Sequence, residues 1–315
     1  MTTKEIYDLV VKLGIKSDLR GEAYVKKTLA RAKKKYEKIK KEERDFFDKD
    51  KLFNPYSDTR ILVDNKKKKI KKILVGIDME TPELLLANSL GDIDLVIAHH
   101  PEGKSLADLS DVMHLQADIL ANYGVPINIA ESLMKRRVAE VSRGISPINH
   151  NRAVDSAKLL KIDYMCTHTV ADNLGANYIE KLLAKKKPEY VEDILEILNE
   201  IPEYKEARKH YAGPRLFTGT PENKCGKIVV TEFTGGTSGS KEMYEKMSQA
   251  GIGTIISMHM GEEYRKEAEK HHINVVIAGH MASDSLGMNL FLDELEKKGI
   301  QLVPTSGLIR VKRVK

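Results

Sequence analysis

The stretch Asp94-Leu95-Val96-Ile97-Ala98-His99-His100-Pro101 is the part of the sequence from which we predict the fold. Four apolar residues that end at a proline predict a short buried strand. This strand carries two imidazoles at its carboxyl end, where open α/β sheets hold their ligands. The stretch Asn274-Val275-Val276-Ile277-Ala278-Gly279-His280 has the same form, and Asp284 follows it. The two stretches together predict one metal site that is assembled from two related halves.

The rest of the chain alternates between predicted strands and predicted helices. We predict further strands over residues 59–63, 70–77, 125–129, 162–169, 227–231, 253–259 and 302–304. We predict helices over residues 3–14, 21–44, 82–89, 106–123, 131–144, 153–160, 171–184, 262–271 and 290–298, with one more that ends near residue 250. This alternation predicts an α/β fold with largely buried sheets.

The predicted elements divide the chain into four parts. Residues 1–56 are expected to form a basic helical extension that packs on the body, and residues 57–184 a first α/β half. Residues 185–216 are expected to form a helical connector, and residues 217–315 a second α/β half. The sequence thus predicts two related α/β halves with a helical N-terminal extension.

Composition and charge narrow the possible functions. The 315 residues include only two cysteines, which predict neither a disulfide framework nor a zinc ribbon. We find no apolar run long enough to span a membrane and no secretory segment, so we expect a cytoplasmic protein. Residues 1–72 carry 23 Lys/Arg against 12 Asp/Glu. This basic segment is compatible with binding to nucleic acid or with a solvated helix face, and it lacks the interleaved aromatic residues of a base-stacking platform.

Spacing suggests which side chains share the metal site. His280 and Asp284 are four residues apart, so a helical turn would place both on one face. Asp172 lies four residues beyond His168, but an aspartate before a helix is also a common N-cap. Adjacent strand residues such as His99 and His100 point to opposite faces unless Pro101 lets the two rings splay toward two neighbouring ions.

The three motifs resemble a known family, the Nif-three-like proteins, many of which are labelled GTP cyclohydrolase I type 2 homologues. The resemblance rests on His99-His100-Pro101, on the stretch from His168 to Asp172, and on Gly279-His280-Met281-Ala282-Ser283-Asp284. It implies two α/β halves, ring-shaped hexamers, and two metal ions bound by His99, His100, Asp172, His280 and Asp284. The family usually has a glutamate where this chain has Asp284.

Two divalent ions in such a site would have open coordination positions, as catalytic sites do. Imidazole and carboxylate ligands suit Zn, Mn, Fe, Co or Ni without choosing among them. His168 and His259 each end a predicted strand, and they are candidates for proton transfer or for ordinary core histidines. The Gly235–Ser240 loop is either a phosphate cradle or a plain turn.

Two functions follow from these expectations. The first is a metal-dependent hydrolase that acts on a small anionic or nucleotide-like substrate with metal-activated water. The second is a metal-binding regulatory or scaffold protein that forms a ring and binds a partner through its basic N-terminal helices.

Overall fold

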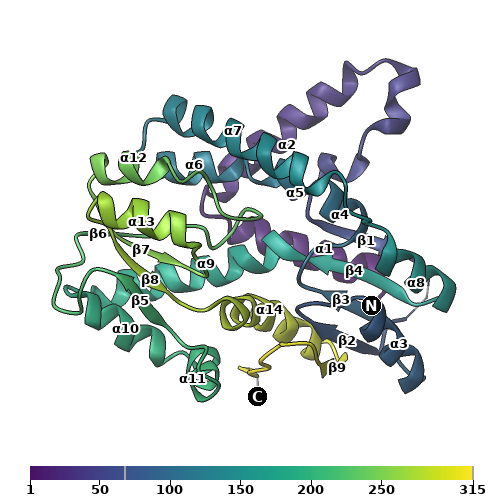
Figure 1. Cartoon of the computed structure of the whole chain (residues 1–315). Coiled ribbons are helices and arrows are strands. Elements are labelled where there is room, and N and C mark those ends of the chain that lie inside the picture. Colours follow the sequence, from purple (N-terminus) through teal and green to yellow (C-terminus); the bar gives the residue numbers. More distant parts are fainter. Residues whose placement is uncertain (67–68, 314–315) are drawn as a thin grey trace.

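Two β-sheets form the framework of the chain in a computed structural model, which describes residues 1–66 and 69–313 (Figure 1). The first sheet has the strand order β1-β4-β3-β2-β9, and the second has the order β5-β8-β7-β6. The strands of the first sheet are β1 (Thr59–Val63), β2 (Lys72–Gly76), β3 (Leu95–Ala98), β4 (Asp163–Thr167) and β9 (Gln301–Pro304). Those of the second are β5 (Arg215–Thr218), β6 (Lys227–Val230), β7 (Ile252–Ser257) and β8 (Asn274–Ile277).

The two sheets repeat one pattern of strand pairing. β1 is antiparallel to β4, β4 is parallel to β3, and β3 is parallel to β2. In the same way, β5 is antiparallel to β8, β8 is parallel to β7, and β7 is parallel to β6. This repetition confirms the predicted fold class of two related α/β halves. The strand β9, from the C-terminal end of the chain, adds to the first sheet beside β2.

Helices cover and connect the sheets. They are α1 (Thr3–Lys16), α2 (Glu22–Glu37), α3 (Thr81–Leu90), α4 (Gly103–Ala107), α5 (Leu109–Val112), α6 (Leu115–Asn122), α7 (Ile127–Ile145), α8 (Arg152–Leu160), α9 (His168–Lys186), α10 (Val191–Asn199), α11 (Pro202–Lys209), α12 (Met243–Gln249), α13 (Glu262–Lys270) and α14 (His280–Glu296). The helices α9 and α14 occupy equivalent places in the two halves, because each begins directly after the strand at the same position of its sheet. They pack against each other between the sheets (Figure 1).

The N-terminal segment contributes to the main hydrophobic core. Ile6, Tyr7, Val10 and Val11 of α1 are buried in the same cluster as the strands of the first sheet. The helix starts at the predicted capping box of Thr2 and Glu5, but it continues past Gly14 to Lys16. The predicted 21–44 helix is shorter than expected, since α2 ends at Glu37 and 3₁₀ turns follow.

Several other sequence predictions need correction. Residues 125–129 do not form a strand, because Pro126 caps the long helix α7, which starts at Ile127. The predicted 106–123 helix is divided into α4, α5 and α6, and the predicted helix 290–298 is the end of α14, which starts at His280. The predicted strand 70–77 is shorter than expected, since β2 spans only Lys72–Gly76.

We find no helix among the described residues that is long and apolar enough to cross a membrane.

Candidate metal centre

His99 and His100 follow β3 directly, at the carboxyl end of the first sheet. The backbone N–H of His99 donates to the carbonyl of Gly76 (2.9 Å) and that of His100 to the carbonyl of Ile77 (3.0 Å), so the path of the strand continues to both histidines. Their ring centroids lie 5.2 Å apart. Both rings therefore belong to one cluster of possible ligands, and their splaying toward two neighbouring ions stays a prediction.

The first turns of α9 and α14 supply the other members of this cluster. His168 and Asp172 are the first and fifth residues of α9, and His280 and Asp284 are the first and fifth residues of α14. Because residues four apart share a helix face, each helix presents one imidazole and one carboxylate together. Asp172 lies one turn inside α9, so the N-cap alternative for this residue is wrong.

Distances show that residues from both halves meet. The rings of His100 and His280 lie 5.3 Å apart, and those of His99 and His168 lie 5.0 Å apart. Nitrogen and oxygen atoms of these side chains form three groups that could each hold a metal ion. The groups are His99, His100 and His168; His100, His280 and Asp284; and His99, Asp172 and Asp284.

Asp284 lies at the centre of the cluster. Its Oδ1 is 3.4 Å from Nε2 of His99, while its Oδ2 is 3.5 Å from Nε2 of both His100 and His280. Oδ1 of Asp172 is 3.3 Å from the same nitrogen of His99. The two oxygens of Asp284 therefore face two different sets of partners.

Buried polar atoms in this cluster have no hydrogen-bond partner in the described part of the chain. They are both ring nitrogens of His99, Oδ1 of Asp172 and both carboxylate oxygens of Asp284. Unpaired buried groups are costly, and a bound cation is the usual compensation for buried carboxylates. The residues present thus fit a metal ion.

The charges of the cluster also favour a bound cation. Burial lowers the pKa of His99, but the carboxylates of Asp284 and Asp172 outweigh it and raise the pKa to about 10. Burial lowers the pKa of His280 to about 4, and the neighbouring imidazole of His259 contributes to this shift. The two carboxylates thus favour a positive charge between them, while His280 stays neutral with a lone pair available for a metal ion.

Two aspartates that the sequence did not single out orient the histidines. Nδ1 of His100 lies 2.6 Å from Oδ1 of Asp78, and Nδ1 of His168 lies 2.8 Å from Oδ2 of Asp58. A carboxylate that accepts from Nδ1–H leaves Nε2 unprotonated and facing the cluster, as in metal-bound histidines. Asp78 follows the apolar run of β2, and this position in the sequence could have marked it as a candidate site residue.

The two histidines predicted for proton transfer lie in different places. His168 is within the cluster itself, in one ligand group with His99 and His100. His259 follows β7 and lies at the edge, with its ring centroid 4.8 Å from that of His280. It occupies the place in the second half that His100 occupies in the first.

Glu232, which the sequence did not single out, and residues of the Gly235–Ser240 loop line the same cavity as the cluster. Glu232 has a backbone φ of +52°, in the left-handed region, and its carboxylate accepts from the N–H of Gly239 and the hydroxyl of Tyr244. Burial raises the pKa of Glu232 to about 7.

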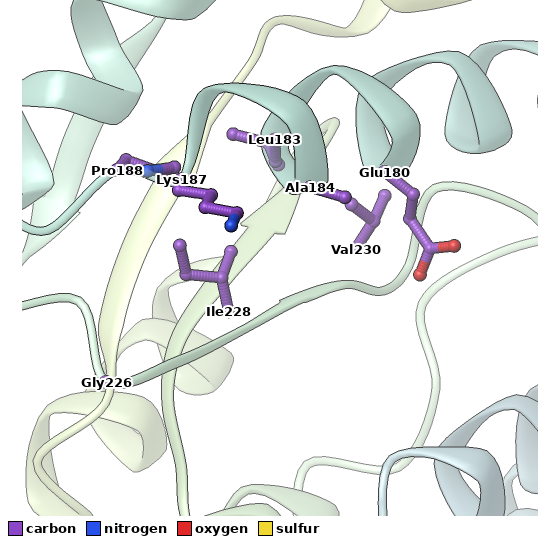
Figure 2. A pocket seen from close by; sticks show the side chains of 8 residues that line it. All are labelled: Glu180, Leu183, Ala184, Lys187, Pro188, Gly226, Ile228 and Val230. Carbon is purple, nitrogen blue, oxygen red and sulfur yellow. The ribbon is translucent and has the colours of Figure 1, made fainter.

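A separate cavity of about 370 Å³ lies between the end of α9 and β6 (Figure 2). Its walls are mainly apolar, with Leu183, Ala184 and Ile228 between Glu180 and Lys187. None of the cluster's histidines or aspartates lines it. This cavity is thus separate from the candidate metal centre.

Comparison with known proteins identifies the fold. No protein-family model matches the sequence, and no curated protein matches it significantly. A crystal structure of a NIF3 superfamily protein from Sphaerobacter thermophilus is 26% identical, with a TM-score of 0.73 over 80% of this chain and 92% of that one. Reduced HcgD from Methanocaldococcus jannaschii is 16% identical, with a TM-score of 0.51 over 78% of this chain and 88% of that one. The chain therefore has the fold of the NIF3 superfamily proteins, with a possible metal site where its two halves meet.

Proposed function

We propose that this chain is a NIF3 superfamily metalloprotein that binds two divalent cations and hydrolyses a small anionic substrate. The observation that carries the proposal is the position of Asp284. Its Oδ1 faces His99 and Asp172, while its Oδ2 faces His100 and His280. One carboxylate that serves two sets of ligands is suited to a pair of ions.

In this proposal, the side chains of the cluster have different roles. His99, Asp172 and Asp284 hold one cation, and His100, His280 and Asp284 hold the other, with His168 beside Asp172 at 3.9 Å. Zn, Mn, Fe, Co and Ni all suit these donors. The cations, when bound, supply an activated water and positive charge for an anionic group. His259 borders the cavity without belonging to a ligand group, which suits a proton-transfer role.

The test is a screen of the purified protein, loaded with Mn, Zn or Fe, for phosphatase, phosphodiesterase and cyclohydrolase activity. His100→Ala removes a ligand candidate, and His272→Ala changes a surface imidazole as the control. We expect turnover that is lost in His100→Ala and retained in His272→Ala, with both variants folded. Turnover that survives in a metal-free protein would contradict the proposal.

A second candidate function rests on α2. Between residues 22 and 41, nine Lys/Arg stand against two Asp/Glu, and Lys33, Lys34 and Lys35 are exposed. The one ion pair of α2 among the described residues joins Lys26 to Glu22. As the alternative, the protein is a metal-stabilised ring, a hexamer by resemblance, whose α2 helices bind a polyanion such as nucleic acid.

The alternative has its own test, which leaves the core intact because α1 stays in place. Replacing Lys33, Lys34 and Lys35 with Gln should weaken binding to duplex DNA and reduce its salt dependence. The matched control replaces Lys185, Lys186 and Lys187 at the end of α9. Equal affinities of the two triple variants would contradict a role for α2.

A further inference from the structure

The loop between β6 and α12 lies directly over the candidate metal centre. Phe233, Thr234, Gly236 and Thr237 line the same cavity as the histidines and aspartates of the cluster. The cavity is small, about 20 Å³, which is room for roughly one water-sized group. Any atom that enters it therefore meets both the loop and the cluster.

The backbone N–H groups of residues 233–238 in this loop have no acceptor within the described part of the chain. Residues 233–238 donate no hydrogen bond from the backbone, although Phe233, Thr234 and Gly235 are buried and Gly236 and Ser238 are half-buried. Buried backbone N–H groups are nearly always paired with protein, water or ligand. The loop thus presents unpaired backbone donors beside the cavity, and Gly236 is one of the residues that line it.

Gln116 of α6 sets the direction of two of these donors. Its Nε2 donates to the carbonyls of Gly235 (2.8 Å) and Thr237 (2.7 Å). In a planar trans peptide the C=O and the following N–H point in opposite directions. The N–H groups of Gly236 and Ser238 therefore both point away from Gln116, to the side of the loop opposite α6.

Packing and anchoring hold the loop in this orientation. A Cβ at Gly235 would lie 2.8 Å from Leu115, so one side of the loop lies directly on α6. Gly235 and Gly236 have φ of +90° and +89°, which glycine adopts without strain. Arg137 donates to the carbonyl of Ser238 at 3.0 Å and fixes the far end. The donors are thus pre-organised.

We infer that the N–H groups of Gly236 and Ser238 bind an oxygen of a phosphoryl group on the substrate. The inference rests on the proposed function, because the cluster below the loop has to carry cations that attract the same group. Backbone N–H groups of a turn that face the same side can form an anion-binding concavity. The small cavity takes the phosphoryl oxygen, so the rest of the substrate stays outside it. Gln116 is a positioning residue for the two donors.

The test uses the full chain, labelled with ¹⁵N-glycine and ¹⁵N-serine, loaded with Zn²⁺ and titrated with inorganic phosphate. We expect saturable shifts of the Gly236 and Ser238 amide signals, while those of Gly91 and Gly144 stay in place. Gln116→Met removes both donations at similar length, and it should weaken phosphate binding about tenfold with the zinc content unchanged. Gln249→Met, on the surface of α12, is the matched control.

The outcomes separate this inference from the proposed function. Zinc binding without a phosphate-dependent shift at Gly236 and Ser238 overturns the loop's role and leaves the metal centre standing. If the signals shift but Gln116→Met binds phosphate with wild-type affinity, we would assign phosphate binding to the metal alone. That result would also overturn the loop's role. A chain that binds no metal contradicts the proposed function first, and the loop's role falls with it unless phosphate still moves the two signals.

Discussion

At the scale of single residues, the candidate site depends on the carboxylate of Asp284, which brings side chains of the two halves together. Asp284 is 1% exposed, and both of its oxygens lack a hydrogen-bond partner in the described structure. The imidazoles of His99 and His100 come from the first half, and Asp284 comes from the second. Its carboxylate lies between side chains that are nearly two hundred residues away in the sequence.

Asp284→Asn should abolish most metal binding. The amide is nearly isosteric, but it removes the negative charge and one of the two oxygens that face separate ligand sets. We expect the bound metal to fall below half of the wild-type value, as measured by elemental analysis after metal loading and desalting. Asp111→Asn changes a surface aspartate paired with Lys51 and should retain the full content. Full metal content in Asp284→Asn would refute this role.

Asp78→Ala should weaken metal binding without abolishing it. The carboxylate of Asp78 orients His100 through Nδ1, and loss of such a partner typically costs about 10–100-fold in metal affinity. Competition with a chromophoric chelator would measure the change. Asp92→Ala, which removes a surface partner of Lys72, serves as the control and should match the wild type. An unchanged affinity in Asp78→Ala would show that His100 needs no such support.

At the scale of elements, the site is held by the contact between α9 and α14. A Cβ at Gly287 would lie 2.2 Å from the carbonyl oxygen of Ala171, so the backbones of the two helices approach closely there. Asp172 and Asp284 are neighbours of this contact in sequence. The distance between the two carboxylates therefore depends on a glycine that carries no chemistry itself.

Gly287→Ala should destabilise the fold and disturb the site. The added methyl group meets backbone rather than a flexible side chain, and overpacking of this kind costs about 1–3 kcal/mol. Denaturant unfolding would measure the loss. Gly144→Ala is the matched control, because a Cβ there meets nothing within 4 Å, and it should be neutral or stabilising by about 0.5–1 kcal/mol. Equal stability of the two variants would contradict close packing at Gly287.

The elements also show what could be predicted from the sequence. Apolar runs that end in histidine predicted β3, β4, β7 and β8, because buried strands need only a short apolar run and a breaker. Val125–Ile129 had the same composition, but Pro126 suits a helix start and the segment opens α7. The starts of α9 and α14 were placed too late, since His168 and His280 themselves begin these helices.

The orienting aspartates could not be predicted for a different reason. Asp58 contacts His168, which is 110 residues away in the sequence. The local spacing of residues does not reveal a contact that tertiary packing creates. The five residues that the resemblance implies as ligands have donor atoms in shared groups, and their role as metal ligands stays a prediction. The place of His168 inside the cluster came only from the structure.

At the scale of the whole molecule, the site joins the two halves. The first half supplies His99, His100, His168 and Asp172, and the second supplies His280 and Asp284. Bound cations would thus crosslink two sheets that otherwise meet through α9, α14 and the added strand β9. A ligand that binds only the folded state stabilises it by mass action.

Removing metal should lower the melting temperature of the protein. With free metal at about 100 times the Kd, the stabilisation is about 2.7 kcal/mol, which corresponds to a shift of about 5–10 °C. Calorimetry with and without chelator would measure it. Asp284→Asn should respond less to the chelator than the wild type, because it retains less metal. A wild-type melting temperature that is equally insensitive would mean that the halves are not joined by metal.

The most direct test of the central claim is an anomalous difference map from crystals of the full chain grown with Zn²⁺. We expect two peaks about 3.5–4 Å apart, one beside each carboxylate oxygen of Asp284. Peaks only at surface histidines such as His272, or no peak among His99, His100 and His280, would contradict this prediction.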